Sequence, residues 1–141
     1  KIKEKFEKHV ILNSIEFLPF LSSTDDHLNA YSEADIALDT FPWNGVTTSF
    51  EAMWMGVPII TMKGFNFNSR CGESINKNIN LENLIAKNKE EYVSTAVNLS
   101  SDREKFMNLR KYIFQDALKT PLFNQENFSK FFFKSLEEII D

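Results

Sequence analysis

Cysteine, histidine, glycine and proline are scarce in this sequence of 141 residues. The 1 Cys excludes an internal disulfide framework and indicates a reducing compartment, so we expect a cytoplasmic protein. With only 2 His beside that cysteine, the composition argues against a structural zinc site. The 4 Gly and 4 Pro leave little room for disorder or for a turn-rich, all-β design.

Long apolar runs and a surplus of positive charge are also absent. No run approaches the roughly 20 apolar residues that a membrane helix needs, and no signal-peptide core opens the sequence, so we expect no membrane partner. The 16 Lys and Arg are outnumbered by 20 Asp and Glu, and the resulting acidic surface would repel phosphates, so we expect no nucleic-acid partner. The 43% of hydrophobic residues is enough for one globular domain over residues 1–141.

A strand–helix–strand unit is predicted between residues 35 and 62. Asp35–Asp39 is a short apolar run bracketed by carboxylates, which is typical of a buried parallel strand. A helix is predicted from Thr47 to Met55, with Gly56 just past its end, and residues 57–62 read as a second buried strand. Because strands joined by a crossover helix are parallel, the sequence predicts an α/β fold.

The remaining sequence is predicted to be mainly helical. Residues 1–9 read as the end of a helix, residues 15–19 as a short strand, and residues 27–32 as a short helix that follows possible N-cap residues. We therefore divide the chain into a βαβ part, about 1–88, and a helical part, about 89–141.

The last predicted helix follows a break at residues 120–124 and carries a Phe-rich apolar stripe. The stripe contains Phe128, Phe131, Phe132 and Leu136 at helical spacing. Such a stripe is predicted to be a packing face rather than a lipid or cofactor site.

The loop before the helix at Thr47 carries the strongest functional signal. Gly45 permits close approach of the backbone, and a helix N-terminus presents unpaired N–H groups with a partial positive charge. Thr47 and Thr48 add two hydroxyl donors, so this segment could cradle a diphosphate. The local pattern is equally compatible with Thr47 or Ser49 merely capping the helix.

Glu51 lies one helical turn beyond the two threonines. A carboxylate there would repel phosphate but suits the two hydroxyls of an adjoining ribose, a division of labour that recurs in nucleotide sites. The alternative is a first-turn glutamate that is stabilised by the helix dipole.

The stretch from Asp39 to Pro58 carries a family resemblance. It reads DTFPWNGVTT, then a glutamate, a tryptophan and GVP, and it resembles the protein O-glycosyltransferases of glycosyltransferase family 41, the O-GlcNAc transferases and their SPINDLY-like relatives. The similarity continues in order through Ser69-Arg70 and residues 84–92 to residues 121–124. It implies a Rossmann-like parallel sheet with flanking helices, the C-terminal half of a GT-B glycosyltransferase, ending in several helices.

The resemblance also assigns roles to positions of this sequence. The phosphate positions are Gly45, Val46, Thr47 and Thr48, the ribose position is Glu51, and the base positions are His27 and Ser22. Read without the resemblance, His27 beside two aspartates is typical of a capping or surface residue; the resemblance favours a stacking contact with the base.

Three positions depart from the animal members of the family, and two of them, Thr24 and Ala30, leave the donor open. Thr24 and Ala30 stand where those members have a Lys and an Arg, and Val46 stands where they have a His. We expect UDP-GlcNAc as the donor, with a GDP-fucose-using relative as the alternative. The family works without a metal, and we find no Asp-x-Asp motif that would hold one, so no metal or other cofactor is expected. Arg70 is predicted to pack or to pair with a carboxylate rather than to reach the cleft.

The sequence thus predicts the nucleotide-sugar-binding portion of an inverting, metal-independent glycosyltransferase that moves a sugar, GlcNAc, to Ser or Thr of a protein acceptor. The chain starts at Lys1 without an initiator Met, so we expect a piece of a longer protein. Its catalytic residues would then lie outside the chain, in an N-terminal catalytic domain that follows tetratricopeptide repeats. The alternative is a non-catalytic nucleotide-binding or interaction module. A receiver-type signalling domain is rejected, because Asp25 and Asp26 follow serines rather than a hydrophobic strand.

Overall fold

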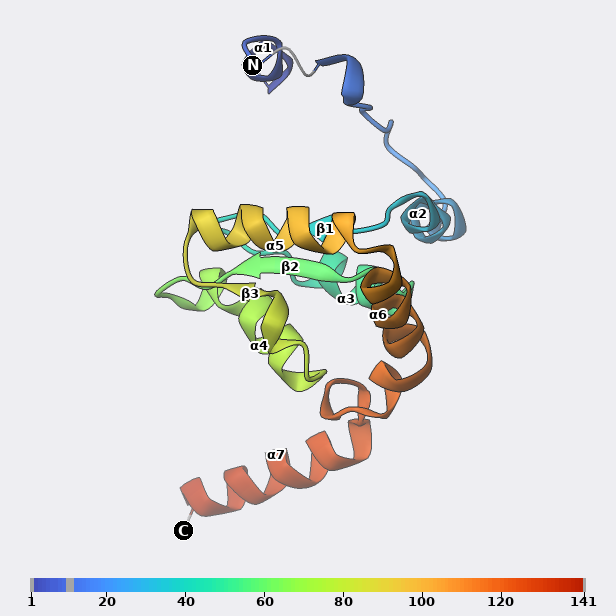
Figure 1. Cartoon of the computed structure of the whole chain (residues 1–141). Coiled ribbons are helices and arrows are strands. Elements are labelled where there is room, and N and C mark those ends of the chain that lie inside the picture. Colours follow the sequence, from blue (N-terminus) through green and yellow to red (C-terminus); the bar gives the residue numbers. More distant parts are fainter. Residues whose placement is uncertain (1, 10–11, 141) are drawn as a thin grey trace.

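Three short parallel strands lie at the centre of the chain, with helices on both faces (Figure 1). The computed structural model describes residues 2–9 and 12–140. The helices and strands are α1 (Ile2–Glu7), α2 (Thr24–Ala30), β1 (Ala37–Leu38), α3 (Thr47–Trp54), β2 (Ile59–Met62), α4 (Cys71–Asn78), β3 (Ile85–Ala86), α5 (Lys89–Ser101), α6 (Arg103–Asp116) and α7 (Gln125–Ile140). The 3-10 turns are Leu12–Ser14, Tyr31–Glu33, Phe67–Ser69, Glu82–Leu84, Ala117–Lys119 and Pro121–Phe123.

The predicted strand–helix–strand unit is confirmed as β1, α3 and β2. The strand order is β1-β2-β3, and both pairs are parallel, with Ala37 opposite Ile59 and Thr61 opposite Ile85. All four residues of β2 are buried because the strand lies in the middle of the sheet. The prediction that β1 is buried is wrong, since this two-residue strand lies at the edge and Leu38 is 56% exposed.

Helix α3 ends as its sequence predicts. Gly56 has a φ of +75°, its N–H donates to Met53 O at 3.0 Å, and the N–H of Val57 donates to Ala52 O at 2.8 Å. These two bonds form a Schellman motif, which needs a residue in the left-handed conformation after the helix. The motif turns the chain directly into β2.

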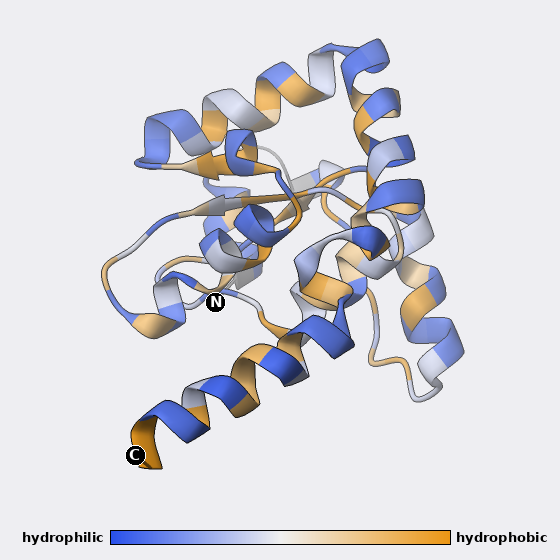
Figure 2. Ribbon diagram, turned by 90° about the horizontal axis from the view of Figure 1, so that it is seen from below, coloured by the Kyte–Doolittle hydropathy of each residue, from blue (hydrophilic) through white to orange (hydrophobic). Residues whose placement is uncertain are grey.

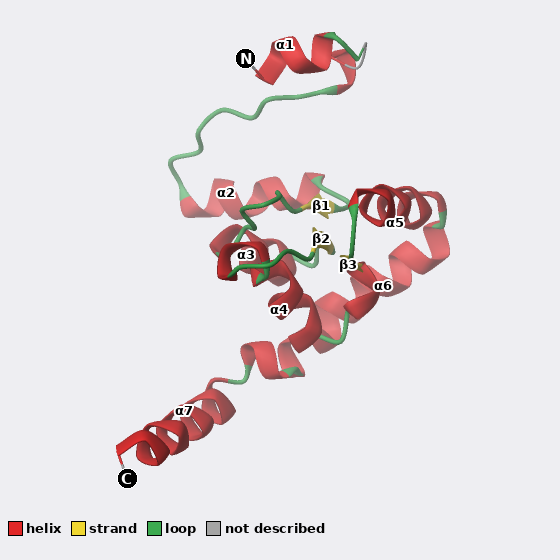
Figure 3. Ribbon diagram, turned by 90° about the vertical axis from the view of Figure 1, so that its left-hand side faces the viewer, coloured by secondary structure: helices red, strands yellow, loops and turns green. Residues whose placement is uncertain are grey.

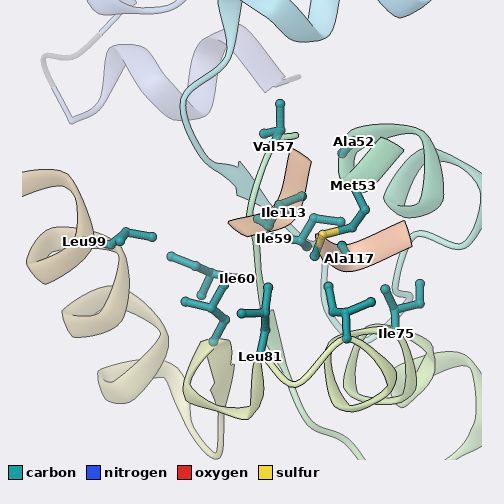
Figure 4. Packing of buried hydrophobic residues seen from close by; sticks show 12 residues of the cluster. Ala52, Met53, Val57, Ile59, Ile60, Ile75, Leu81, Leu99, Ile113 and Ala117 are labelled. Carbon is teal, nitrogen blue, oxygen red and sulfur yellow. The ribbon is translucent and has the colours of Figure 1, made fainter. Parts of the chain in front are cut away.

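The hydrophobic core lies between the sheet and its helices. Helix α5 covers one face of β2, and α3 and α4 cover the other, as the edge-on view of the strands in Figure 3 shows. Met53, Ile59, Ile113 and Ala117 meet at the centre of the buried cluster (Figure 4). The core therefore fixes the start of α3 relative to the end of β1.

The helix predicted within residues 1–9 is confirmed as α1 over the described residues, but the segment that follows it differs from the predictions. Residues 15–19 form no strand; they belong to an extended connection that leads from α1, which stands apart from the sheet, to α2 (Figure 1). Helix α2 begins at Thr24 rather than at residue 27, because Ser23 Oγ accepts from the N–H of Asp26 at 3.3 Å.

Helix α7 projects from the body with alternating apolar and polar stripes (Figure 2). The prediction that its phenylalanine stripe is a packing face is wrong for the chain as described, since no residue of α7 is buried and Phe131 is 70% exposed. In the described ranges, 2–9 and 12–140, no helix combines the length and apolar character needed to cross a membrane.

Candidate functional site

The N-terminus of α3 has no side-chain cap. Its N-cap residue is Val46, which offers no hydroxyl, so the alternative that Thr47 or Ser49 caps the helix is wrong. The N–H of Phe50 donates to Val46 O at 3.0 Å, so the amides between them have no acceptor within the helix. Thr47 and Thr48 are exposed beside these amides. Among the described residues these amides have no hydrogen-bond acceptor, so the helix start presents unpaired donors and the positive end of its dipole.

The loop between β1 and α3 is held by the carboxylate of Asp39. Its Oδ1 accepts from the N–H of Gly45 at 2.7 Å, and its Oδ2 accepts from Oγ1 of the buried Thr61 at 2.7 Å. Burial raises the pKa of Asp39, against the opposing effect of the hydrogen bonds from Gly45, Thr61 and the Thr40 amide. Because Thr61 lies on β2, the carboxylate ties the loop to the middle strand.

Gly45 lies where the loop leaves little room for a side chain. A methyl group on Gly45 would lie 2.7 Å from both the Thr48 and the Ser49 hydroxyl oxygens. The sequence predicted that Gly45 would let the backbone come close to a neighbouring group. In the structure the neighbouring groups are the Thr48 and Ser49 side chains of α3.

Two further side chains brace the same loop from distant elements. The buried Asn44 donates through Nδ2 to Thr40 O at 2.8 Å and accepts through Oδ1 from the N–H of Gly72 at 3.3 Å. The hydroxyl of Tyr92, on α5, donates to Asp39 O at 2.7 Å, and burial raises the pKa of this tyrosine to about 12. The loop is thus fixed against α4 and α5 as well as against the sheet.

Glu51 lies where α2 approaches α3. Its Oε2 is 3.0 Å from His27 Nε2, and the hydroxyl of Tyr31 donates to the same oxygen at 3.2 Å. Tyr31 also lies edge-on to the His27 ring, with 5.7 Å between the ring centroids. The carboxylate and the imidazole are partly exposed, at 27% and 44%, so both remain accessible to a ligand.

Most of the predicted site residues lie together. The start of α3 contributes Gly45, Val46, Thr47 and Thr48, and the contact between α2 and α3 brings His27 to Glu51. Ser22 is exposed in the connection before α2, and within the described part of the chain it shares no hydrogen bond with the other candidates. Its predicted contact with the base stays a prediction.

Sequence reasoning missed Tyr31, Asn44 and Tyr92, and it gave Asp39 no role in this site. A signal existed for Asp39, which follows a strand at the carboxyl edge of a parallel sheet, where ligand loops gather. Asn44 and Tyr92 act across 28 and 53 residues of sequence, and no local pattern marks such partners.

Arg70 is paired with a carboxylate, as predicted. Its Nε lies 2.8 Å from Glu73 Oε2, while Lys77 and Lys63 approach Glu73 Oε1 at 2.9 and 3.3 Å. The hydrogen bond from Arg70 is the largest cause that lowers the pKa of the buried Glu73 carboxyl to about 2, and the two lysines act in the same direction against burial.

A Glu73→Gln variant is expected to lose about 2 kcal/mol of unfolding free energy at pH 7, because three cations lose their common counterion. The folded carboxyl titrates near 2 and the unfolded one near 4.5, so this contribution is complete above about pH 5 and is lost as the pH falls towards 2. Chemical denaturation of the wild type and the variant between pH 7 and pH 3 measures the difference between their unfolding free energies. The titration of all other groups cancels in this difference. Glu82→Gln, at an exposed position, is the control, and a difference that is constant with pH would contradict the assignment.

Two cavities adjoin the start of α3. A small one of about 170 Å³ is lined by Tyr31, Asp39, Gly45 and Thr48. A larger one of about 640 Å³ lies on the other side of the helix start, where Val46 and Phe50 face Phe67 and Arg70. In the part of the chain that the structure describes, no cluster of three or more His, Cys, Asp or Glu side chains could hold a metal ion.

Comparison with known proteins shows one consistent family. The family model described as glycosyl transferase family 41 matches residues 2–132. A tomato (Solanum lycopersicum) protein named "Probable UDP-N-acetylglucosamine--peptide N-acetylglucosaminyltransferase SPINDLY" is 41% identical over 116 residues, 82% of this chain and 12% of the relative. A Caenorhabditis elegans UDP-N-acetylglucosamine–peptide N-acetylglucosaminyltransferase is 31% identical over 108 residues, 77% of this chain and 9% of the relative.

The likeness extends to three dimensions. A solved structure of a mutant O-GlcNAc transferase from Thermobaculum terrenum superposes with a TM-score of 0.77 at 32% identity, over 82% of this chain and 23% of that one. This likeness and the parallel sheet with flanking helices confirm the predicted fold class. The chain spans about 12% of the length of the tomato relative.

Proposed function

The chain belongs to glycosyltransferase family 41, and from this premise we propose that it forms the nucleotide-sugar-binding part of an enzyme that transfers a sugar to protein hydroxyl groups. The sugar would be GlcNAc, carried by UDP, and the acceptor a Ser or Thr side chain. The names of the tomato and nematode relatives state this donor and a peptide acceptor for those proteins.

The observation that carries the proposal is the uncapped start of α3 beside the pair formed by His27 and Glu51. Free amides and the hydroxyls of Thr47 and Thr48 would donate to the diphosphate, and the dipole of the helix would favour its negative charge. Glu51, one turn further along α3, would accept from the ribose hydroxyls. The exposed face of His27 would stack against the base.

The reaction itself needs groups beyond this site. A helix N-terminus carries about half a positive charge, which offsets only part of a diphosphate. We therefore propose that the cation that stabilises the leaving diphosphate, the catalytic residues and the acceptor site belong to a further catalytic domain. In this arrangement residues up to about 88 bind the nucleotide and the helices after it complete the domain. Independence from metal ions, a cytoplasmic location and tetratricopeptide repeats belong to the same proposal.

A GDP-fucose donor is the second candidate. It stays open because Thr24 and Ala30 stand on α2 where the animal enzymes that the sequence resembles carry two cations. These replacements leave α2 without the positive charge that would contact a uridine diphosphate in those enzymes. The choice of base is therefore part of the test below.

Titration calorimetry of the complete protein with UDP and with GDP tests the proposal. We expect one of the two to bind, and a Thr47→Val, Thr48→Val double variant to bind it about tenfold more weakly, because two hydrogen bonds to a charged ligand are lost. Thr95→Val, on α5 and away from the site, is the matched control and should bind as the wild type does. Absence of binding by either nucleotide would refute the proposed function and favour an interaction module.

A further inference from the structure

We propose that Tyr31 is a positioning residue for ribose recognition: its hydroxyl holds Oε2 of Glu51, so that Oε1 is left to accept from the ribose hydroxyls. The proposal rests on the proposed function, since it concerns how that site reads its nucleotide. It adds a role for a residue that contacts the ligand only through another side chain.

The contacts around Glu51 are divided unequally between its two oxygens. Oε2 is 3.2 Å from the Tyr31 hydroxyl and 3.0 Å from His27 Nε2. Oε1 shares no hydrogen bond or ion pair with the residues in the described ranges. A carboxylate oxygen can accept two hydrogen bonds, so Oε2 is saturated, while Oε1 keeps its full capacity and, since the side chain is 27% exposed, is open to a ligand.

Tyr31 is itself held rigidly at this point. Its ring packs against the hydrophobic core and lies edge-on to the His27 ring, at an interplanar angle of 89°. Its hydroxyl is also 3.3 Å from Thr48 O, so its single proton is shared between this carbonyl and Glu51. One hydroxyl therefore bridges the proposed ribose and phosphate positions of the site.

The protonation of Tyr31 suits this role. The phenol must keep its proton to donate to a carboxylate, and burial together with the neighbouring Glu51 raises its pKa to about 12. The spacing of four residues between His27 and Tyr31 places both on the face of α2 and its 3-10 extension that meets α3. The same short segment thus supplies the proposed base contact and the brace for the ribose carboxylate.

The test uses a Tyr31→Phe variant of the complete protein, titrated with UDP and with 2′,3′-dideoxyuridine diphosphate, or with the corresponding guanosine pair if that base is bound. The variant keeps the ring and its contact with His27 but loses the hydroxyl. We expect the wild type to prefer the ribonucleotide by about tenfold or more. The variant should bind the ribonucleotide about fivefold more weakly and the dideoxy analogue almost unchanged, so the preference shrinks.

The matched control is Tyr112→Phe, whose lost hydroxyl donates to Ile79 O in the core, far along the chain from the site. It should bind both nucleotides as the wild type does. If Tyr31→Phe lowered the affinity for both nucleotides equally, or kept the full wild-type preference for the ribonucleotide, the positioning role would be overturned. The proposed function would still stand. A wild type that binds both nucleotides equally would overturn the ribose assignment, and one that binds neither would refute the proposed function on which it rests.

Discussion

A Glu51→Ala variant is expected to bind UDP or GDP about 30-fold more weakly than the wild type, a loss of about 2 kcal/mol. The reason is that the variant loses the acceptor that we assign to both ribose hydroxyls, and hydrogen bonds to charged groups are the strong ones. The variant also releases His27 and Tyr31, which Glu51 Oε2 joins to α3. The first effect weakens the contact with the ribose, and the second weakens the contact of His27 with the base.

Titration calorimetry measures this change, and thermal unfolding of the same samples shows whether the fold is retained. Glu33→Ala removes an exposed acid from the 3-10 turn after α2 and serves as the control for net charge. Glu51→Gln keeps the shape of the side chain and one acceptor oxygen, so its affinity for the nucleotide should fall between those of the wild type and Glu51→Ala. Unchanged affinity of a folded Glu51→Ala variant would refute the ribose assignment.

An Asp39→Ala variant is expected to lose about 3 kcal/mol of unfolding free energy and, where it still folds, most of its nucleotide affinity. The change leaves the buried Thr61 hydroxyl and the Gly45 amide without their acceptor. An unsatisfied buried donor costs its full desolvation. Without that tie the loop no longer fixes the start of α3, so the amides and hydroxyls proposed for the diphosphate lose their arrangement.

Denaturant unfolding and calorimetry on the same protein separate the two effects. Asp35→Ala is the matched control, because Asp35 lies just before β1 but is 81% exposed and lies 3.6 Å from Arg110. Asp39→Asn has the same size, but its side-chain NH2 group faces either the Gly45 N–H or the Thr61 hydroxyl, both of which are donors. It should therefore lose about 2 kcal/mol of unfolding free energy, which would show that the loop needs a carboxylate at this position. Full stability and full affinity of Asp39→Ala would contradict the role of this loop.

The elements predicted correctly are those whose causes are local. The helix from Thr47 ends just before Gly56 because a glycine there can adopt the left-handed conformation, and β2 is buried because its apolar run lies in the middle of the sheet. The strand at Ala37–Leu38 was predicted to be buried because its residues are apolar, but burial depends on a second neighbouring strand, which the described sheet does not provide. Periodicity likewise identified the apolar face of α7 without showing what would cover it.

The candidate site was predicted in the same uneven way. His27, Thr47, Thr48 and Glu51 were identified because family resemblance acts position by position. The residues that arrange them were not, since Tyr31 reaches Glu51 across 20 residues and Asn44 reaches Gly72 across 28. Such contacts exist only after the sheet has brought α2, α3 and α4 together.

A crystal structure of the complete protein with bound UDP, or GDP if that is the nucleotide it binds, tests the nucleotide site most directly. We predict the diphosphate at the unpaired amides at the start of α3, a ribose hydroxyl on Glu51 Oε1, and the base against the His27 ring. Tyr31 should keep its contact with Glu51 Oε2 in that complex. A nucleotide bound elsewhere, for instance in the cavity between Phe50 and Phe67 with the start of α3 unoccupied, would contradict the assignment.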